Sequence, residues 1–178
     1  MMHQIVIAGF GGQGVMTMGQ LLAYAGMLEG KEVSWLPSYG PEMRGGTANC
    51  HVIITDEGTV GSPIITDATA VMVMNRPSLA KFEPLTVPDG LLLINASLIA
   101  DKPKREDIEA LYVPANEIAD ELKDIRVANM VMLGAYLKRS GAVTVESIAK
   151  ALHKAFGEEK AGLIPINMEA LKRGADCV

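Results

Sequence analysis

The sequence predicts an α/β fold: a single three-layer domain with a mostly parallel sheet, a β-hairpin and a helical C-terminal region. Short apolar runs rich in β-branched residues alternate with segments whose apolar residues recur at helical spacing. A glycine-rich turn joins the first of these runs to the first helical segment, and from residue 115 onward the pattern is helical. A chain of 178 residues can bury a substantial core, so we expect one domain over residues 1–178.

The N-terminal part predicts a βαβ unit. Residues 4–8 (QIVIA) predict a buried parallel strand. Apolar residues recur at helical spacing over 15–28, and Gly30 gives that helix its C-terminal stop. A second strand is expected over 32–36, and a right-handed crossover should make it parallel to the first.

The rest of the chain predicts further strands and then helices. Residues 47–55 (TANCHVIIT) predict a longer strand, and Asp56-Glu57-Gly58 predicts a hairpin turn to a short return strand near Val60. The other expected strands cover 70–74, 91–95 and 111–114, and the other expected helices cover 79–82, 115–122, 128–140, 144–156 and 166–173.

Composition and charge argue against several classes of protein. The formal net charge is −5, and the densest basic group, 102–105, is followed at once by Glu106 and Asp107, so a nucleic-acid groove is not expected. No run of about 18 apolar residues could span a membrane, and no secretory signal pattern is present, so we expect a soluble, cytoplasmic protein. Cys50 and Cys177 are too few for a disulfide framework or a four-thiolate metal site, and an iron–sulfur cluster would need ligands from another chain. The 11 methionines are expected chiefly to fill an aliphatic core.

The glycine turn carries the first functional hypothesis. Gly9, Gly11 and Gly14 have the spacing G-x-G-x-x-G between a strand and a helix. In Rossmann-like folds the first glycine permits a tight turn, the second lets the backbone approach a phosphate, and the third lets helix and strand pack closely. The first N–H groups of the helix then face the anion. We therefore expect a phosphate site here; the alternative is a tight turn that binds nothing.

The end of the second strand argues against a dinucleotide ligand. A nicotinamide or flavin site needs an acid there to hold the adenosine ribose. Here the strand ends at Leu36-Pro37-Ser38, and no carboxylate follows before Glu42. A phosphate-bearing ligand other than NAD is favoured.

The segment from Ser38 to Thr47 (SYGPEMRGGT) should lie at the same edge of the sheet as the glycine turn, because it follows the second strand. The guanidinium of Arg44 suits a phosphate or carboxylate, and Gly45-Gly46 would let backbone approach a ligand. The alternative is that Arg44 pairs with Glu42 or a buried partner and only shapes the loop.

Together, GFGGQGV and SYGPEMRGGTANCHV resemble the gamma subunit of 2-oxoacid:ferredoxin oxidoreductases. The same unit occurs as one domain of fused pyruvate:ferredoxin oxidoreductases and in indolepyruvate enzymes. The resemblance covers essentially the whole chain, including the run from Asn129 to Gly134 (NMVMLG). The run PEMRGGTAN is most similar to the 2-oxoglutarate type, although branched-chain enzymes have similar gamma chains.

The resemblance implies one subunit of an enzyme that converts a 2-oxoacid, coenzyme A and oxidised ferredoxin to acyl-CoA, carbon dioxide and reduced ferredoxin. It implies alpha and beta partners, a ferredoxin-like delta subunit in some members, and ferredoxin as electron acceptor. Thiamine diphosphate, magnesium and iron–sulfur clusters would then lie in partner subunits, and this chain would help to position coenzyme A and close the site. The isolated chain is expected to be inactive.

The residues that match the two family motifs are expected near coenzyme A or a subunit interface, and no catalytic or metal-binding residue is assigned. They are Gly9, Phe10, Gly11, Gly12, Gln13, Gly14, Ser38, Tyr39, Arg44, Gly45 and Gly46.

Two other hypotheses remain open at this stage. One is a purely structural assembly subunit whose glycine turn is empty, and the other is a stand-alone NAD-dependent dehydrogenase, which the missing ribose acid disfavours. His3, His51 and His153 are far apart in the sequence and are expected in ordinary core or surface positions.

Three further polar residues have simple structural interpretations. Cys50 is expected to be a small buried hydrophobe. Asn95 ends a strand, where a turn role is favoured over a place in the site, and Asn129 is expected to cap a helix.

Overall fold

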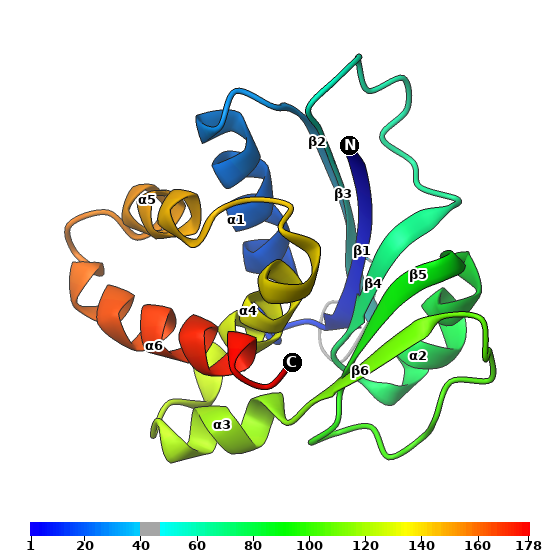
Figure 1. Ribbon diagram of the computed structural model, residues 1–178. Helices are drawn as coiled ribbons and strands as arrows, with labels where there is room; N and C mark the ends of the chain where they lie inside the picture. Colours follow the sequence, from blue (N-terminus) through cyan, green and yellow to red (C-terminus); the bar gives the residue numbers. More distant parts are fainter. Residues whose placement is uncertain (40–46) are drawn as a thin grey trace.

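A computed structural model describes residues 1–39 and 47–178 of the chain. The described residues form a six-stranded sheet in the order β2-β3-β1-β4-β5-β6 (Figure 1). The strands are β1 (Met2–Phe10), β2 (Glu32–Tyr39), β3 (Thr47–Thr55), β4 (Ala68–Val73), β5 (Thr86–Asn95) and β6 (Glu109–Val113). The predicted α/β class with a mostly parallel sheet is confirmed.

The position of β3 is the main feature that the sequence did not predict. β4 runs parallel to β1, β5 to β4 and β6 to β5, whereas β3 is antiparallel to both β1 and β2. β2 is therefore parallel to β1, as the βαβ pattern predicted, but β3 lies between them. The carboxyl ends of β1 and β2 consequently lie at the same edge of the sheet, two strands apart.

The predicted β-hairpin partner of β3 was wrong. No strand forms near Val60, and residues 56–67 run to β4 without regular structure. The physical reason is that β3 bonds to β1 along one edge and to β2 along the other, so no edge is free for a return strand. The antiparallel pair of consecutive strands is instead β2 with β3.

The helices agree with the sequence pattern to within a few residues. They are α1 (Val15–Leu28), α2 (Arg76–Phe82), α3 (Ala115–Glu121), α4 (Ala128–Ser140), α5 (Val145–Phe156) and α6 (Ile164–Ala175). In Figure 1, α1 and α4 lie against one face of the sheet with α5 and α6 outside them, and α2 lies on the other face. This places helices on both faces, as a three-layer domain requires.

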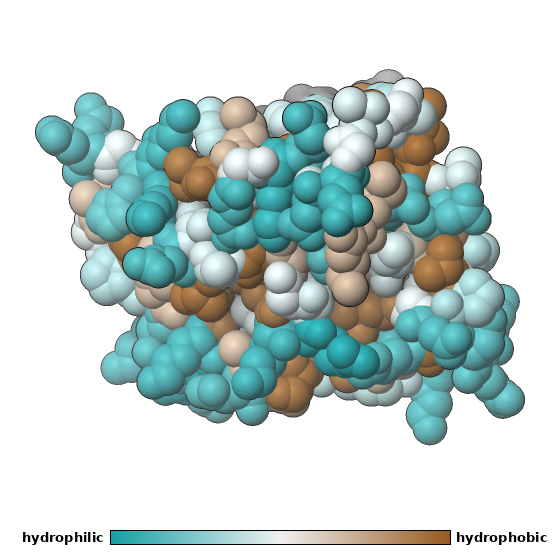
Figure 2. Space-filling model, turned by 45° about the horizontal axis from the view of Figure 1, so that its top comes forward, coloured by the Kyte–Doolittle hydropathy of each residue, from teal (hydrophilic) through white to brown (hydrophobic). Residues whose placement is uncertain are grey.

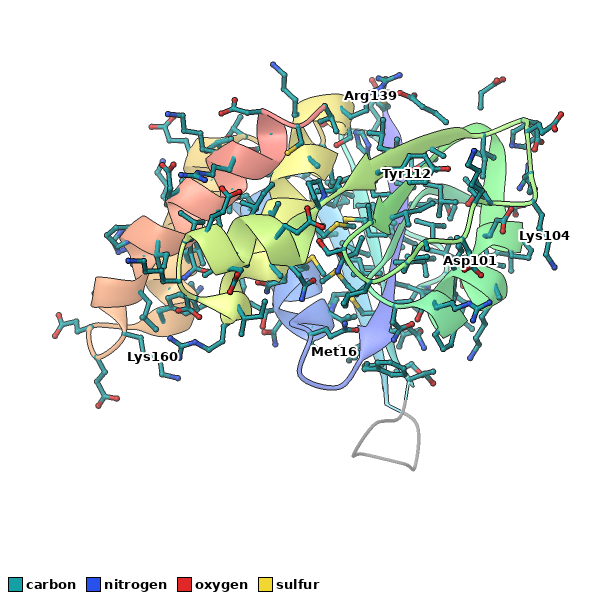
Figure 3. All side chains as sticks on the ribbon, turned by 90° about the horizontal axis from the view of Figure 1, so that it is seen from below. Met16, Asp101, Lys104, Tyr112, Arg139 and Lys160 are labelled. Carbon is teal, nitrogen blue, oxygen red and sulfur yellow. The ribbon has the colours of Figure 1, made fainter. Side chains whose placement is uncertain are left out.

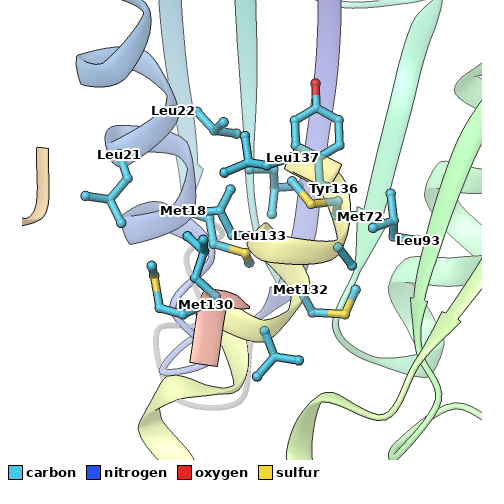
Figure 4. Close-up of a cluster of buried hydrophobic side chains, with 14 of the residues drawn as sticks. Met18, Leu21, Leu22, Met72, Leu93, Met130, Met132, Leu133, Tyr136 and Leu137 are labelled. Atoms are coloured by element: carbon cyan, nitrogen blue, oxygen red, sulfur yellow. The ribbon is translucent and has the colours of Figure 1, made fainter. Parts of the chain in front are cut away.

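The larger core lies between the sheet, α1 and α4. Figure 4 shows Met18 and Leu22 of α1 together with Met130 and Leu133 of α4, next to Met72 of β4. All five side chains are fully buried, so the expected core-filling role of methionine is confirmed for Met18, Met72 and Met130. The packing fixes the start of α4 relative to the start of α1, where the glycine turn lies.

The outer surface is mixed in character. On the face seen in Figure 2, hydrophobic residues form small groups separated by hydrophilic ones. Among the helices of the described residues, none combines the length and the apolar character that crossing a bilayer would require.

Candidate functional site

The glycine turn from Gly9 to Gly14 lies at the carboxyl edge of the parallel strands. Figure 3 looks at the molecule from this side and shows Met16 at the start of α1, next to the turn. The register pairs Gly9 of β1 with Ala48 of β3, which in turn pairs with Tyr39 of β2. The end of β1, the start of β3 and the end of β2 therefore meet at one edge. The sequence predicted this for β1 and β2.

Each glycine of the turn has its own structural reason. Gly12 and Gly14 have φ of +91° and +75°, in the left-handed region that favours glycine. Gly9 instead leaves room for a neighbour, because a Cβ there would lie 2.7 Å from Oε1 of Gln13 and 2.8 Å from Cβ of Met74. Gly11 is exposed and is not among the residues of positive φ, so a side chain there would not strain the backbone.

The side chain of Gln13 braces the turn from inside. Its Oε1 accepts a hydrogen bond from the backbone N–H of Phe10 at 2.7 Å, and its Nε2 donates to the carbonyl of Met74 at 3.2 Å. The N–H of Gln13 also donates to the carbonyl of Phe10 at 3.2 Å. These bonds join the turn to β1 and to the end of β4, so its backbone is held in place without a ligand.

The N-terminus of α1 is uncapped. Gly14 is its N-cap residue, no side chain bonds to the first turn, and that turn contains no acidic residue. The first N–H groups of a helix lack intrahelical acceptors, and the helix dipole adds partial positive charge there. These groups border a hollow of about 360 Å³ whose lining includes Phe10, Gly11, Gly12, Met16 and Thr17. The arrangement suits an anion such as a phosphate.

Asn129 reaches the glycine turn from α4. The expectation that it caps a helix was wrong: the N-cap residue of α4 is Val127, and Asn129 lies within the first turn. Its Nδ2 faces the carbonyl of Gly14 at 3.4 Å, and a Cβ on Gly14 would overlap the Asn129 side chain. The third glycine of the motif therefore makes room for α4. Sequence spacing could not reveal this, because α4 and the turn are 115 positions apart.

Two positively charged side chains border a second hollow, which Gly12 and Gly14 also line. They are Arg126 and Lys160, and Thr17 lies there too. Asp124 pairs with Arg126 at 2.7 Å, and the hydrogen bond from this guanidinium holds the pKa of the Asp124 carboxyl below its usual value. Figure 3 shows Lys160 in the connection between α5 and α6. Thr17 could have been predicted, since it lies in the first turn of the helix after the motif, whereas Arg126 and Lys160 carry no local signal.

The second predicted segment is only partly described. Ser38 and Tyr39 end β2, where they pair with Asn49 and Ala48. Since neighbouring strands lie about 4.8 Å apart, β3 separates the end of β2 from the glycine turn by roughly 10 Å. Arg44, Gly45 and Gly46 lie outside the described residues.

The same strand order bears on the NAD hypothesis. In dinucleotide-binding folds the ribose acid comes from the strand next to the one that precedes the glycine turn. Here that neighbour is the antiparallel β3, which begins rather than ends at this edge, and β2 lies one strand further out. The geometry therefore adds to the missing carboxylate as evidence against a dinucleotide site.

The remaining chemistry-bearing side chains have structural roles. Cys50 is fully buried, as predicted, and burial raises the pKa of its thiol to about 12. His51 accepts a hydrogen bond at Nδ1 from the N–H of Ile65 at 2.9 Å, while His3 is half-buried and His153 is exposed. The carbonyl of Asn95 accepts from the N–H groups of residues 98 and 99, which is the predicted turn role. Within 1–39 and 47–178, no group of three or more His, Cys, Asp or Glu side chains is placed to hold a metal ion.

Known proteins with similar sequences support a common origin over most of the chain. The chain is 42% identical over 175 residues to the ketoisovalerate oxidoreductase subunit VorA of Methanothermobacter marburgensis, covering 97% of this chain and 36% of that protein. It is 34% identical over 155 residues to the 2-oxoglutarate synthase subunit KorC of Methanocaldococcus jannaschii, covering 85% of this chain and 82% of that protein. The chain thus spans about a third of the length of VorA, but most of the length of KorC.

Solved structures show the same fold. The gamma subunit of a keto/oxoacid ferredoxin oxidoreductase from Geobacter sulfurreducens matches with a TM-score of 0.82 at 27% identity, over 98% of this chain and 96% of that one. The 2-oxoglutarate:ferredoxin oxidoreductase of Magnetococcus marinus, described with 2-oxoglutarate, coenzyme A and succinyl-CoA bound, matches with a TM-score of 0.89 at 23% identity, over 99% of this chain and 31% of that one.

The family assignment rests on the whole chain rather than on the glycine turn alone. The family model described as pyruvate ferredoxin/flavodoxin oxidoreductase matches residues 4–177, which include both motifs and the helices α1 to α6 of the described residues. The resemblance to gamma subunits is confirmed, and the chain belongs to the pyruvate ferredoxin/flavodoxin oxidoreductase family.

Proposed function

We propose that this chain, over residues 1–178, is the gamma-type component of a 2-oxoacid:ferredoxin oxidoreductase and that its glycine turn binds the diphosphate of coenzyme A. The observation that carries the proposal is the uncapped start of α1, which opens onto a hollow lined by Gly11 and Gly12. A diphosphate supplies the negative charge and the acceptor oxygens that these N–H groups lack. The coenzyme A bound in the Magnetococcus marinus enzyme, whose fold this chain shares, supports the choice of ligand.

The glycine turn is the main part of the proposed site, with Gly9, Phe10, Gly11, Gly12, Gln13 and Gly14. The motif residues Ser38 and Tyr39, with Arg44, Gly45 and Gly46, are proposed to lie near coenzyme A or against a partner subunit. Partner subunits of alpha and beta type would hold thiamine diphosphate, magnesium and the iron–sulfur clusters. In that assembly this chain binds and orients coenzyme A, so that its thiol reaches the acyl group formed by decarboxylation.

The 2-oxoacid is proposed to be 2-oxoglutarate, with a branched-chain oxoacid as the second candidate. The run PEMRGGTAN and the similarity to the KorC subunit support the first. The similarity to the VorA subunit at 42% identity favours the second. The value of kcat/KM of the purified complex, measured for 2-oxoglutarate, ketoisovalerate and pyruvate in turn, distinguishes the two candidate substrates.

The test of coenzyme A binding is a charge placed at Gly11 in the assembled complex. Because Gly11 is exposed and has no positive φ, Gly11→Asp adds a carboxylate without backbone strain, and Gly11→Asn is its neutral match of the same size. We expect Gly11→Asp to raise the KM for coenzyme A at least tenfold above that of Gly11→Asn, because a carboxylate at this distance repels the diphosphate. An equal KM in the two variants would favour the structural subunit with an empty turn.

Omitting the chain tests its membership in the complex. Alpha and beta partners purified without it should show little coenzyme A-dependent ferredoxin reduction, and adding the chain should restore it. Equal turnover with and without the chain would contradict the proposal.

A further inference from the structure

Beside the glycine turn lies a small hollow of about 160 Å³ bordered by side-chain amides from three elements. Gln13 comes from the turn, Asn116 from the first turn of α3, and Asn129 from the first turn of α4. Met74 and Ile125 supply apolar lining, and Arg126, which pairs with Asp124, also borders the hollow. Gly12 borders both this hollow and the one at the start of α1. In Figure 1, α3 and the start of α4 lie at the same lower edge of the molecule as the turn.

Asn129 presents an acceptor that nothing in the described chain satisfies. Its amide faces the carbonyl of Gly14, which can only accept, so the atom on that side is Nδ2 and Oδ1 points the other way. Oδ1 is buried and has no hydrogen-bond partner, in a residue that is 6% exposed. A buried acceptor without a donor destabilises the fold, and a ligand N–H would remove that cost.

Asn116 presents the complementary donor. Its Oδ1 accepts from Nδ2 of the buried Asn95 at 2.8 Å, and its backbone N–H donates to Oγ of Ser97 at 3.1 Å. These two bonds fix the Asn116 amide and leave its Nδ2 with no acceptor among the described residues. Asn129 and Asn116 therefore offer the hollow an unpaired acceptor and an unpaired donor, which is the pattern that pairs with a secondary amide.

We propose that this hollow binds an amide of the pantetheine arm of coenzyme A, with Asn129 accepting from its N–H and Asn116 donating to its C=O. The inference rests on the proposed function and deepens it, since it gives the amide-bearing arm a place next to the diphosphate. Coenzyme A carries two secondary amides on the arm that leaves its diphosphate, separated by methylene groups. Met74 and Ile125 provide the apolar contact that those methylene groups need.

The test separates the arm from the nucleotide end of the ligand. In the assembled complex, the KM for coenzyme A is measured together with the inhibition constant of adenosine 3′-phosphate 5′-diphosphate, which has the same three phosphates but no amide. We expect Asn116→Leu and Asn129→Leu each to raise the KM about threefold to tenfold, the equivalent of one lost hydrogen bond, and to change the inhibition constant less than twofold. Asn116 is only half-buried, so its variant remains informative if Asn129→Leu fails to fold.

The outcomes are distinct. An unchanged KM in Asn116→Leu, or an inhibition constant that rises as much as the KM in both variants, would overturn the inference, because the amides would then only shape the turn. Gly11→Asp tests the proposed function separately, and it should raise both constants. If Gly11→Asp raises both while Asn116→Leu raises neither, the inference fails and the proposed function stands. If Gly11→Asp changes neither constant, the proposed function itself fails.

Discussion

The side chain of Gln13 joins the glycine turn to the end of the neighbouring strand: its Nε2 donates to the carbonyl of Met74 at 3.2 Å. Its Oε1 at the same time accepts from the N–H of Phe10 at 2.7 Å. One amide therefore satisfies a donor at the end of β1 and an acceptor at the end of β4. The protein's own contacts therefore hold the turn in place, which would lower the ordering cost of binding the proposed ligand.

Replacing Gln13 by leucine should destabilise the fold. Gln13→Leu leaves the Phe10 N–H and the Met74 carbonyl without their partner, and we expect a loss of about 1–3 kcal/mol in the free energy of unfolding. Gln20→Leu is the matched control, because Gln20 is exposed on α1. Urea unfolding followed by circular dichroism measures both variants. Equal stability of the two would mean that the Gln13 bonds contribute nothing.

The crossing of α4 and α6 should tolerate no side chain at its closest point. A Cβ on Gly134 would overlap the backbone carbonyl of Leu171, and one on Gly174 would overlap that of Val131. Gly134→Ala must therefore push the two helices apart, and we expect a loss of at least about 3 kcal/mol or failure to fold. Gly162→Ala is the control, since a Cβ there would meet nothing within 4 Å. A Gly134→Ala variant as stable as this control would contradict the observed crossing.

Glu29 should make the stability depend on pH in the acid range. Burial alone would raise its pKa, but hydrogen bonds from Thr144, Ser147 and Lys31 outweigh burial and lower it to about 2. The carboxylate thus stabilises the fold fully above its ordinary pKa of 4.5, and this contribution is lost as the pH falls from there toward about 2.

Glu29→Gln tests this dependence. The variant should be about 1–2 kcal/mol less stable at pH 7 and show a flatter loss of stability between pH 5 and pH 2, in the range where Glu29 titrates. Glu158→Gln, which removes an exposed carboxylate, should retain the steeper profile of the unmodified protein. The free energy of unfolding in urea at each pH gives the measurement. Parallel profiles for the two variants would argue against the pKa shift.

The two cysteines should differ strongly in reactivity. Cys50 is fully buried and burial raises its pKa to about 12, whereas Cys177 is exposed near the C-terminus. Iodoacetamide at pH 8 should therefore modify Cys177 in the native protein and reach Cys50 only in urea. Peptide mass spectrometry identifies the site. Native labelling of Cys50 at a comparable rate would mean that β3 opens from the sheet.

The sequence predicted most helices and strands, because their start, end and periodicity are set by residues close together in the chain. The apolar spacing over 15–28 gave α1 its observed bounds, and the run 47–55 gave β3 its observed bounds. Strand pairing is different, because a strand pairs with whatever edge the rest of the chain leaves free. The turn residues Asp56-Glu57-Gly58 predicted a hairpin, but β3 already has a neighbour on each side.

The candidate site shows the same division. The spacing of Gly9, Gly11 and Gly14 placed a strand-to-helix turn, and positive φ at Gly12 and Gly14 agrees with it. Asn116 was overlooked, although its position just after the strand 111–114 could have placed it at the same edge of the sheet. Asn129 was misinterpreted as a cap, because its contact with Gly14 depends on how α4 packs.

By itself, the sequence determined most of the elements, the glycine turn and, through two long motifs, the family. These follow from backbone preferences, apolar periodicity and residue identity, all of which are local. The tertiary structure decided that β3 separates β1 from β2, which of the turn's glycines make room for Gln13 and Asn129, and which amides border the turn. Those outcomes depend on packing between segments far apart in the chain, where the gain in buried apolar area, and not any local preference, selects the arrangement.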